Sequence, residues 1–284
     1  MNKKVSDILS DLTNHADGIW SYQFSNVIQS EEIQMRGEVA LGKFSYLDEI
    51  SKHHSVIVMD VEIALFLEKV PVGGVILDVG GCWGWHWRTI WRNRPDVTVF
   101  ILDFVRQNLI HATQLLRDVI NKNVYLVHGD ATHLGFRDCT FDAWWSVQTL
   151  QHIPNFKLAV SEAHRVLKPN GVFANYSLNN QILVRCIYSL FSKPYVVKGK
   201  IPGSFYLNRA SDDQLQYIES VFEAKLHRRF SEILFSPELG IVFPGRRTSM
   251  FGIIDSMLSG GKRTFAWIAR QQSFHLRKHR LNGS

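Results

Sequence analysis

The sequence predicts an α/β protein whose doubly wound, mostly parallel sheet has helices on both faces. Three observations lead to this fold class. Strand-like and helical segments alternate between about residues 70 and 178, the first strand-like segment ends in a glycine-rich turn, and hydrophobic residues make up 45% of the 284 residues. With 20% charged residues, this composition is typical of a folded chain with a large core and argues against disorder of the bulk.

The first seventy residues predict helices, because VSDILSDL and VIVMDVEIALFLEKV place apolar residues at helical intervals. The pattern then changes to strands, for which the candidates are VILDVGG, VTVFILD, NVYLVHGD, FDAWWSV and GVFANYSL. NLIHATQLLRDVI and FKLAVSEAHRVLKP are helical segments between them. Right-handed crossovers would align the carboxyl ends of the strands along one edge, where ligands bind in such folds.

The alternation fails after Leu178, and the residues up to about 210 show no clean period. Ser211 is a predicted N-cap for the helix DDQLQYIESVF. AKLHRRFSEILF predicts a strand, SPELGIVFPGRRTSMFG a loop or short helix, and KRTFAWIARQ a last strand or helix. We therefore divide the chain into an N-terminal helical cap (1–70), a core (71–178), and a segment (179–284) that supplies a lid, a substrate pocket and closing strands.

Composition also bounds the cellular setting. The polar N-terminus lacks the apolar region of a signal peptide, and no apolar run approaches the ~20 residues of a membrane-spanning helix. Three widely separated cysteines fit a reducing compartment better than a disulfide framework. We therefore expect a cytoplasmic protein, and no histidine or cysteine spacing predicts a metal site.

The net charge of +6 is concentrated at one end of the chain. Residues 225–284 carry eleven Lys or Arg against three acids, a balance of +8, whereas the preceding residues have a balance of −2. One interpretation is a solvated face with a frayed tail, RKHRLNGS. The other is contact with an anionic partner, such as a phosphorylated substrate, the inner membrane surface or nucleic acid.

The most informative motif is VILDVGGCWG, in which a strand enters a tight turn and opens a helix whose free N–H groups attract an anion. A nicotinamide-type G-x-G-x-x-G fingerprint would need glycines at 80, 82 and 85, but Cys82 and Trp85 occupy two of those positions. The loop instead reads D-x-G-G-C-x-G. Asp103 closes the second strand 19 residues after Gly84, at a position where an acid can accept both ribose hydroxyls.

These motifs resemble class I S-adenosylmethionine (SAM)-dependent methyltransferases. Asp78, Gly80 and Gly84 match their motif D-x-G-x-G-x-G, and Cys82 stands at the middle glycine. GDATHLGF is similar to the family's G-D-A-x-x-L-P-F, FDAWWSVQTLQHI to F-D-x-V-x-S-x-x-x-L-H-H-I, and EAHRVLKPNGVF to R-V-L-K-P-G-G-x-F. The resemblance covers about residues 70–178 and is closest to the branch that methylates small molecules, lipids and sugars.

The resemblance implies a Rossmann-like sheet of seven strands and a cofactor, SAM, that leaves as S-adenosyl-L-homocysteine. It implies that Asp103 binds the ribose and that Asp130 contacts the adenine amino group, although Asp130 could instead form a turn. The residues expected to contact the cofactor are Asp78, Gly80, Gly81, Cys82, Trp83, Gly84, Asp103, Asp130, Ala131 and Gln148.

Two further sites concern the methyl acceptor. His152 lies just beyond the fourth strand, where a neutral imidazole could act as general base or could hold the loop by hydrogen bonds. Arg246 and Arg247 form a pair suited to bidentate capture of phosphate or carboxylate oxygens.

We therefore expect methyl transfer to oxygen on an anionic small-molecule, sugar or lipid acceptor, including phosphorylated ones. One alternative is a nucleic-acid methyltransferase, but SVQTLQHI stands where an exocyclic-amine DNA enzyme would show D/N-P-P-Y/F. Another alternative is a SAM-binding regulatory domain without turnover. A nicotinamide oxidoreductase is excluded by the glycine spacing.

Overall fold

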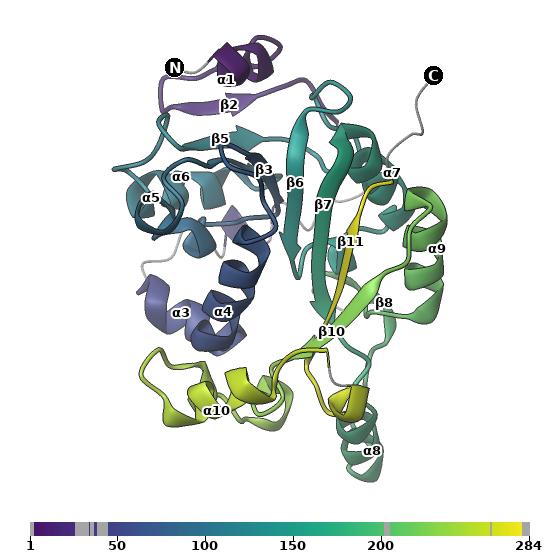
Figure 1. The fold of residues 1–284 in the computed structure, drawn as a ribbon. Coiled ribbons are helices and arrows are strands. Elements are labelled where there is room, and N and C mark those ends of the chain that lie inside the picture. Colours follow the sequence, from purple (N-terminus) through teal and green to yellow (C-terminus); the bar gives the residue numbers. More distant parts are fainter. Residues whose placement is uncertain are drawn as a thin grey trace.

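The computed structural model describes residues 3–25, 34, 37–38, 45–201, 205–261 and 263–279. Within them, nine strands form one sheet in the order β1-β2-β5-β4-β3-β6-β7-β11-β10 (Figure 1). Pairing is parallel from β2 to β7 and antiparallel at both ends. The strands are β1 (Thr13–Asn14), β2 (Ile19–Ser21), β3 (Val75–Val79), β4 (Thr98–Asp103), β5 (Val124–His128), β6 (Phe141–Val147), β7 (Leu167–Leu178), β10 (His227–Ser231) and β11 (Gln271–Arg277), with a separate pair β8 (Lys198–Lys200) and β9 (Tyr206–Asn208).

Helices cover both faces of the sheet, as the alternating segments predict. The α-helices are α1 (Lys3–Leu9), α3 (Tyr46–His53), α4 (Val56–Leu67), α5 (Ile90–Asn93), α6 (Arg106–Leu115), α7 (Phe156–Val166), α8 (Ile182–Leu190), α9 (Asp212–Phe222) and α10 (Met250–Leu258). The 3-10 helices are η1 (Trp85–Trp87), η2 (Leu150–His152), η3 (Pro237–Leu239), η4 (Phe243–Gly245) and η5 (Arg263–Phe265). No helix in the described ranges has the length and apolarity that crossing a bilayer requires.

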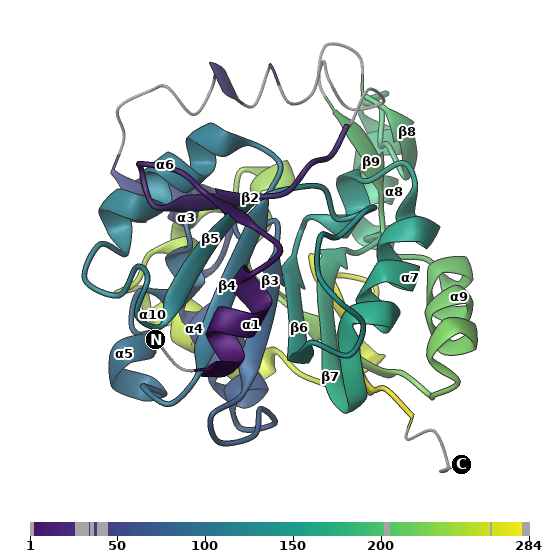
Figure 2. The same cartoon turned by 90° about the horizontal axis from the view of Figure 1, so that it is seen from above.

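Side-chain alternation along the central strands separates two cores. In β3, Val75, Leu77 and Val79 pack with α1, α7 and α9, whereas Ile76 packs on the other face with α4, α5 and α6. Figure 2 shows α7 and α9 side by side on their face of the sheet. The predicted N-cap is confirmed, because Ser211 and Gln214 form a reciprocal capping box at the start of α9.

The expectation of seven strands is wrong, because the first seventy residues contain β-structure as well as helices. The short pair β1 and β2 turns at Gly18, whose φ of 77° suits glycine, and β2 then pairs in parallel with β5. Ile19 is fully buried there. The segment is too short for its alternation to be distinguished from a helical pattern in sequence.

The C-terminal part also differs from the prediction. Residues 263–270 of the segment KRTFAWIARQ form η5 and an irregular turn, the last strand begins only at Gln271, and residue 262 lies outside the described part of the chain. This strand, β11, lies between β7 and β10. The predicted frayed tail is therefore partly structured: Arg277 lies in β11, and the buried Lys278 donates from Nζ to the carbonyls of His164 and Leu167. Residues 280–284 lie outside the described part of the chain.

Candidate functional site

A cavity of about 700 Å³ opens at the carboxyl ends of β3, β4, β5 and β6. One part of its wall is the turn after β3 together with the ends of the neighbouring strands. The other part comes from α3, from the β8–β9 region and from the residue that precedes β11. Of the ten expected cofactor residues, nine line this cavity: Asp78, Gly80, Gly81, Cys82, Trp83, Asp103, Asp130, Ala131 and Gln148.

Asp78, at the end of β3, is 1% exposed, and its Oδ2 accepts a 2.6 Å hydrogen bond from Nε1 of Trp87. Burial raises the pKa of Asp78 to about 7, the hydrogen bond from Trp87 opposes this shift, and the nearby Asp103 carboxylate adds to it. A Cβ at Gly81 would collide with this carboxylate. Asp78 thus helps to hold the turn after β3 and also lines the cavity.

The turn after β3 runs through left-handed backbone at three positions, Gly80 (φ 72°), Cys82 (φ 52°) and Gly84 (φ 70°). Cys82 therefore keeps the conformation that the family motif gives to glycine, at a steric cost that glycine would not have. Gly84 differs from its expected role, because it does not line the cavity. A side chain there would collide with Leu116, so Gly84 lets η1 pack closely against α6.

Asp103 and Asp130 occupy matching places after neighbouring strands. Asp103, 3% exposed, accepts from the backbone N–H of Cys82 (3.0 Å) and of Val105 (2.8 Å). Asp130 accepts from the N–H of Thr132 (2.8 Å), so it does form the turn that sequence analysis considered as an alternative. Both residues also line the cavity. The carboxylates of Asp78, Asp103 and Asp130 therefore meet at one site.

Gln148 follows β6 with a left-handed φ of 50°, and its backbone N–H donates to the carbonyl of Tyr176 (2.7 Å). Its buried amide nitrogen has no hydrogen-bond partner among the described residues. Strained backbone and an unsatisfied buried donor on the wall of a cavity are both typical of ligand sites.

His152 lies in the same cavity wall, and hydrogen bonds engage both of its ring nitrogens. The Tyr206 carbonyl is 2.8 Å from Nδ1 and can only accept, so Nδ1 carries the proton. Nε2 is 3.0 Å from the amide nitrogen of Gln151, whose Oε1 accepts from the N–H of Leu178. This arrangement is the one expected if His152 ties η2 to β9, which was the alternative to a general base.

The other part of the cavity contains basic side chains that sequence analysis missed. Arg209, Arg270, His53, His54 and His86 all line it. Arg209 and Arg270 are 61 residues apart and sit outside any motif, so no local signal marks them. His86 offered a signal, because it stands two residues after Gly84 in the glycine turn. Its burial lowers the pKa to about 3, helped by the neighbouring His54 and Arg88, and the ring is neutral near pH 7.

A buried ion pair between Glu232 and Arg270 supports these basic groups. Glu232, fully buried, accepts from Nη1 of Arg270 (2.7 Å) and from the N–H of Ser55 (2.7 Å). Burial opposes its ionisation, but Arg270 and His54 hold the pKa of Glu232 at about 2. Glu232 also has a left-handed φ of 57°, so the backbone is strained where it holds Arg270.

Arg246 and Arg247 do not line the cavity. Both are exposed in the turn between η4 and α10, and the cationic side chains that do line the cavity are Arg209 and Arg270. Arg270, which does line the cavity, belongs to the same basic C-terminal part of the sequence.

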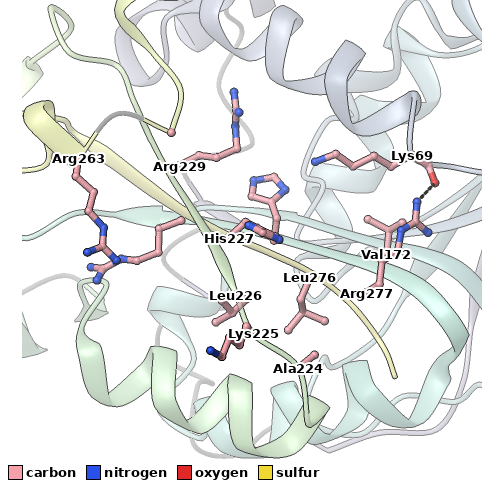
Figure 3. Close-up of a pocket in the computed structure, with 13 residues that line it drawn as sticks. Lys69, Val172, Ala224, Lys225, Leu226, His227, Arg229, Arg263, Leu276 and Arg277 are labelled. Carbon is pink, nitrogen blue, oxygen red and sulfur yellow. Dashed lines mark hydrogen bonds between the residues drawn. The ribbon is translucent and has the colours of Figure 1, made fainter. Parts of the chain in front are cut away.

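A second, open cavity of about 780 Å³ lies toward the other end of the sheet, around the edge strand β10 (Figure 3). Its cationic lining includes Lys69, Lys225, Arg228, Arg263 and Arg277, together with Arg229, which forms an ion pair with Glu62. Arg228 and Arg229 lie on the edge strand β10 itself, where charged side chains oppose pairing with another chain. None of the predicted site residues lies there.

Comparison with known proteins agrees with the site geometry. The profile of a family described as "Methyltransferase domain" matches residues 77–175. A demethylmenaquinone methyltransferase from Listeria monocytogenes is 32% identical over 190 residues, which cover 65% of this chain and 70% of that protein. The chain belongs to the class I SAM-dependent methyltransferases. Other curated relatives match over shorter stretches, and the chain spans 31% of the demethylmenaquinone methyltransferase of Staphylococcus epidermidis at 39% identity.

Solved structures of this methyltransferase family's fold superpose at low sequence identity. The YcgJ protein from Bacillus subtilis has a TM-score of 0.52 and 18% identity, covering 81% of this chain and all of that one. The [4+2]-cyclase SpnF has a TM-score of 0.52 and 17% identity, covering 78% and 81%. Since a cyclase shares this fold, the reaction must be argued from the site itself.

Proposed function

We propose that this chain binds SAM in the cavity at the ends of β3–β6 and transfers its methyl group to a small-molecule, sugar or lipid acceptor. The observation that carries the proposal is the meeting of three buried carboxylates, Asp78, Asp103 and Asp130, beside a left-handed glycine turn. SAM is a cation, and three carboxylates around one cavity provide a complementary field. Membership of the methyltransferase family supports the same assignment.

Different residues are proposed to contact different parts of the cofactor. In this proposal Asp103 accepts the ribose hydroxyls, Asp130 contacts the adenine, and the backbone of residues 80–83 meets the methionine portion. The unsatisfied amide nitrogen of Gln148 provides a further donor. Bound SAM would supply an electrophilic methyl carbon on sulfur: the acceptor oxygen–carbon bond would form as the carbon–sulfur bond breaks, the electron pair would stay on sulfur, and the hydroxyl proton would pass to solvent. The protein contributes alignment and exclusion of water.

The acceptor, in this proposal, carries a carboxylate or phosphate that meets Arg209 and Arg270. Both guanidinium groups are nearly buried, at 6% and 5% exposure. Their distances to Glu238, 3.9 Å from Arg209 Nη2 and 3.5 Å from Arg270 Nε, are longer than an ordinary N–H···O hydrogen bond. An acceptor anion can therefore improve on the contacts that Glu238 provides.

The acceptor atom is proposed to be a hydroxyl oxygen, and the neutral His86 ring is placed to orient it. Nδ1 of His86 is buried without a hydrogen-bond partner among the described residues. The low pKa keeps the His86 ring neutral, so in this proposal its unprotonated nitrogen accepts the hydrogen bond of the hydroxyl and does not keep the proton. His152 acts in this scheme as a positioning group for the loop after β6, through the contacts described above.

Two measurements test the proposal. Native mass spectrometry of the purified protein should detect bound SAM or S-adenosylhomocysteine. Release of S-adenosylhomocysteine should then depend on an added hydroxylated anion and, at SAM concentrations near the wild-type Kd, fall strongly in Asp103→Ala. If SAM binds but no S-adenosylhomocysteine forms with any of a broad set of carboxylated and phosphorylated acceptors, the regulatory alternative replaces this proposal. If neither ligand binds at millimolar concentration, the cofactor assignment itself is wrong.

A further inference from the structure

Helix α10 turns its apolar side outward. Met250, Phe251, Ile253, Ile254 and Met257 are exposed, Met250 and Met257 by 67% and 74%, whereas the inward positions are Gly252 and the charged Asp255. A surface helix in a water-soluble protein normally buries its apolar stripe and exposes its polar side. The reversal indicates that an apolar environment covers this helix.

Contacts on the inner side fix the helix in this orientation. Oδ1 of Asp255 accepts from the backbone N–H of Ile233 (2.6 Å) and of Leu234 (3.1 Å). Gly252 packs so closely that a Cβ would press on the carbonyl of Pro244 and on Ile57. Rotation of α10 to bury its isoleucines would leave these amides unsatisfied and would bring bulk against Pro244.

The apolar side of α10 belongs to a larger surface. Phe243 packs edge-to-face on Phe251 at 4.9 Å between ring centroids, and Trp267 adjoins α8 through the hydrogen bond from Leu183 N–H to its carbonyl (3.2 Å). Figure 1 shows α10 and α8 at the same end of the molecule. Twelve of the seventeen exposed large hydrophobic side chains of the described residues belong to α8, α10 and the segments beside them, and we call this set the apolar rim: Ile182, Leu183, Leu190, Phe191, Val242, Phe243, Met250, Phe251, Ile253, Ile254, Met257 and Trp267.

Basic residues outnumber acids beside the apolar rim, although α3, which packs against η4, carries the acids Asp48 and Glu49. Arg185 and Lys193 are exposed on and after α8, and Arg246, Arg247 and Arg263 are exposed around α10. The described residues from 181 to 201 include no acid, and those from 240 to 269 include only the buried Asp255. An isologous contact with a second copy would bring this cationic surface against itself, which is unfavourable. Apolar and aromatic side chains with flanking Arg and Lys match the interface of an anionic bilayer.

We propose that the apolar rim docks the protein on an anionic membrane surface, with α10 and α8 lying in the headgroup region. The exposed apolar side chains enter the acyl boundary, and Arg246 and Arg247 remain at headgroup level. This gives the arginine pair a role outside the cofactor cavity. It also names one anionic partner, a membrane surface, for the basic C-terminal part of the sequence.

The test is co-sedimentation with phosphatidylcholine vesicles, with and without about 30% phosphatidylglycerol. We expect binding to the anionic vesicles that is at least tenfold tighter and that weakens with salt. Phe251→Ser/Ile254→Ser/Met257→Ser and Arg246→Glu/Arg247→Glu should each weaken it about tenfold or more. The matched control Val61→Ser/Val72→Ser/Leu158→Ser removes three exposed apolar side chains elsewhere and should bind as the wild type does.

Hydrogen exchange on the wild-type protein gives a second measurement that does not depend on variants folding. Added anionic vesicles should slow exchange in α8 and α10 and leave α7 and α9 unchanged. The proposal is overturned if the wild type does not bind anionic vesicles or if protection appears elsewhere. It is also overturned if size-exclusion chromatography with light scattering finds a dimer that the α10 triple variant dissociates, since the occupant would then be a second copy.

Discussion

The backbone N–H of Cys82 donates a hydrogen bond to Oδ2 of Asp103 across 3.0 Å. This contact joins the turn after β3 to the end of β4, so one carboxylate holds the shape of the turn and also faces the cavity. A substitution of Asp103 therefore changes two things at once, the cofactor contact and the turn, and the design of variants has to separate them.

Asp103→Ala should lower the affinity for SAM about tenfold to a hundredfold, because a charged acceptor opposite ligand donors is worth roughly 1.5–3 kcal/mol. Asp103→Asn keeps an oxygen for the Cys82 N–H and loses the charge. We expect the Asp103→Asn variant to regain the thermal stability that Asp103→Ala loses. Its affinity for SAM should remain below that of the wild type. Calorimetric titration of both variants measures this, and an unchanged affinity in Ala would refute the ribose assignment.

Cys82→Gly should stabilise the protein by about 0.5–1 kcal/mol. Relief of the left-handed strain, roughly 1–2 kcal/mol, exceeds the extra backbone entropy that glycine loses on folding, roughly 0.5–1 kcal/mol. SAM binding should be retained or improved, since the thiol is not expected to react. Chemical denaturation compares the two proteins, with Cys139→Gly as a control because Cys139 also has a positive φ (51°) and lies far from the cavity. A Cys82→Gly variant that binds SAM normally but has no turnover would reveal a chemical role for the thiol.

The affinity for SAM should rise with pH up to about 7 and then level. Burial raises the pKa of Asp78 to about 7, so the free protein holds a proton there below that pH. A bound cation favours the ionised carboxylate, so binding near pH 6 must release a proton, and the association constant increases as pH rises toward 7. Titration calorimetry in two buffers of different ionisation enthalpy measures the released proton directly. Asp78→Asn should remove this proton release, and its persistence in that variant would assign it to another group.

His152→Gln should lower stability by about 1–2 kcal/mol, because it breaks the hydrogen bond to the Tyr206 carbonyl and disturbs Gln151. We expect kcat to fall while the pH dependence of kcat/KM keeps its shape. If the profile instead loses its acidic limb, the general-base interpretation of His152 is correct and the positioning role is not.

Arg270→Gln should raise the KM for an anionic acceptor about tenfold or more and leave SAM affinity within about twofold, since it removes a charge-assisted contact at the acceptor part of the cavity. Arg246→Glu/Arg247→Glu is the matched comparison and should leave the KM of a water-soluble acceptor unchanged. Because Arg270→Gln also leaves Glu232 without its guanidinium partner, thermal unfolding of the variant must be measured alongside. Equal KM effects from both variants would contradict the assignment of Arg270.

Local sequence signals were sufficient to predict that the three carboxylates of the proposed cofactor site would meet at one edge of the sheet. Asp78, Asp103 and Asp130 each end or follow a buried strand, and parallel strands bring such ends to one edge regardless of the rest of the chain. The seven-strand expectation failed at β1 and β2, which are too short to show a period, although their pairing with β5 buries Ile19 completely.

The acceptor half could not be predicted in the same way. Arg209 and Arg270 line one cavity only through the long connections between β7, β9 and β11, and Glu232 reaches Arg270 from the end of β10. Gly84 matches the motif, but the structure uses its small size for packing against Leu116. A motif shows that a small residue is required and does not show which group it contacts. Helix α10 carries no polar stripe facing water, so the rule that apolar residues face inward gave no guide to its orientation.

The position of β11 has a consequence for how the chain reaches this structure. β11, at residues 271–277, separates β7 from β10, although β10 precedes it by some forty residues. During synthesis, β10 has no neighbour in the sheet until β11 arrives, and the side of β7 that β11 will cover stays open. Such non-local closure slows folding and leaves unpaired backbone exposed to association with other chains. The cationic side chains of β10, Arg228 and Arg229, would therefore protect the nascent chain from aggregation before they serve the finished sheet.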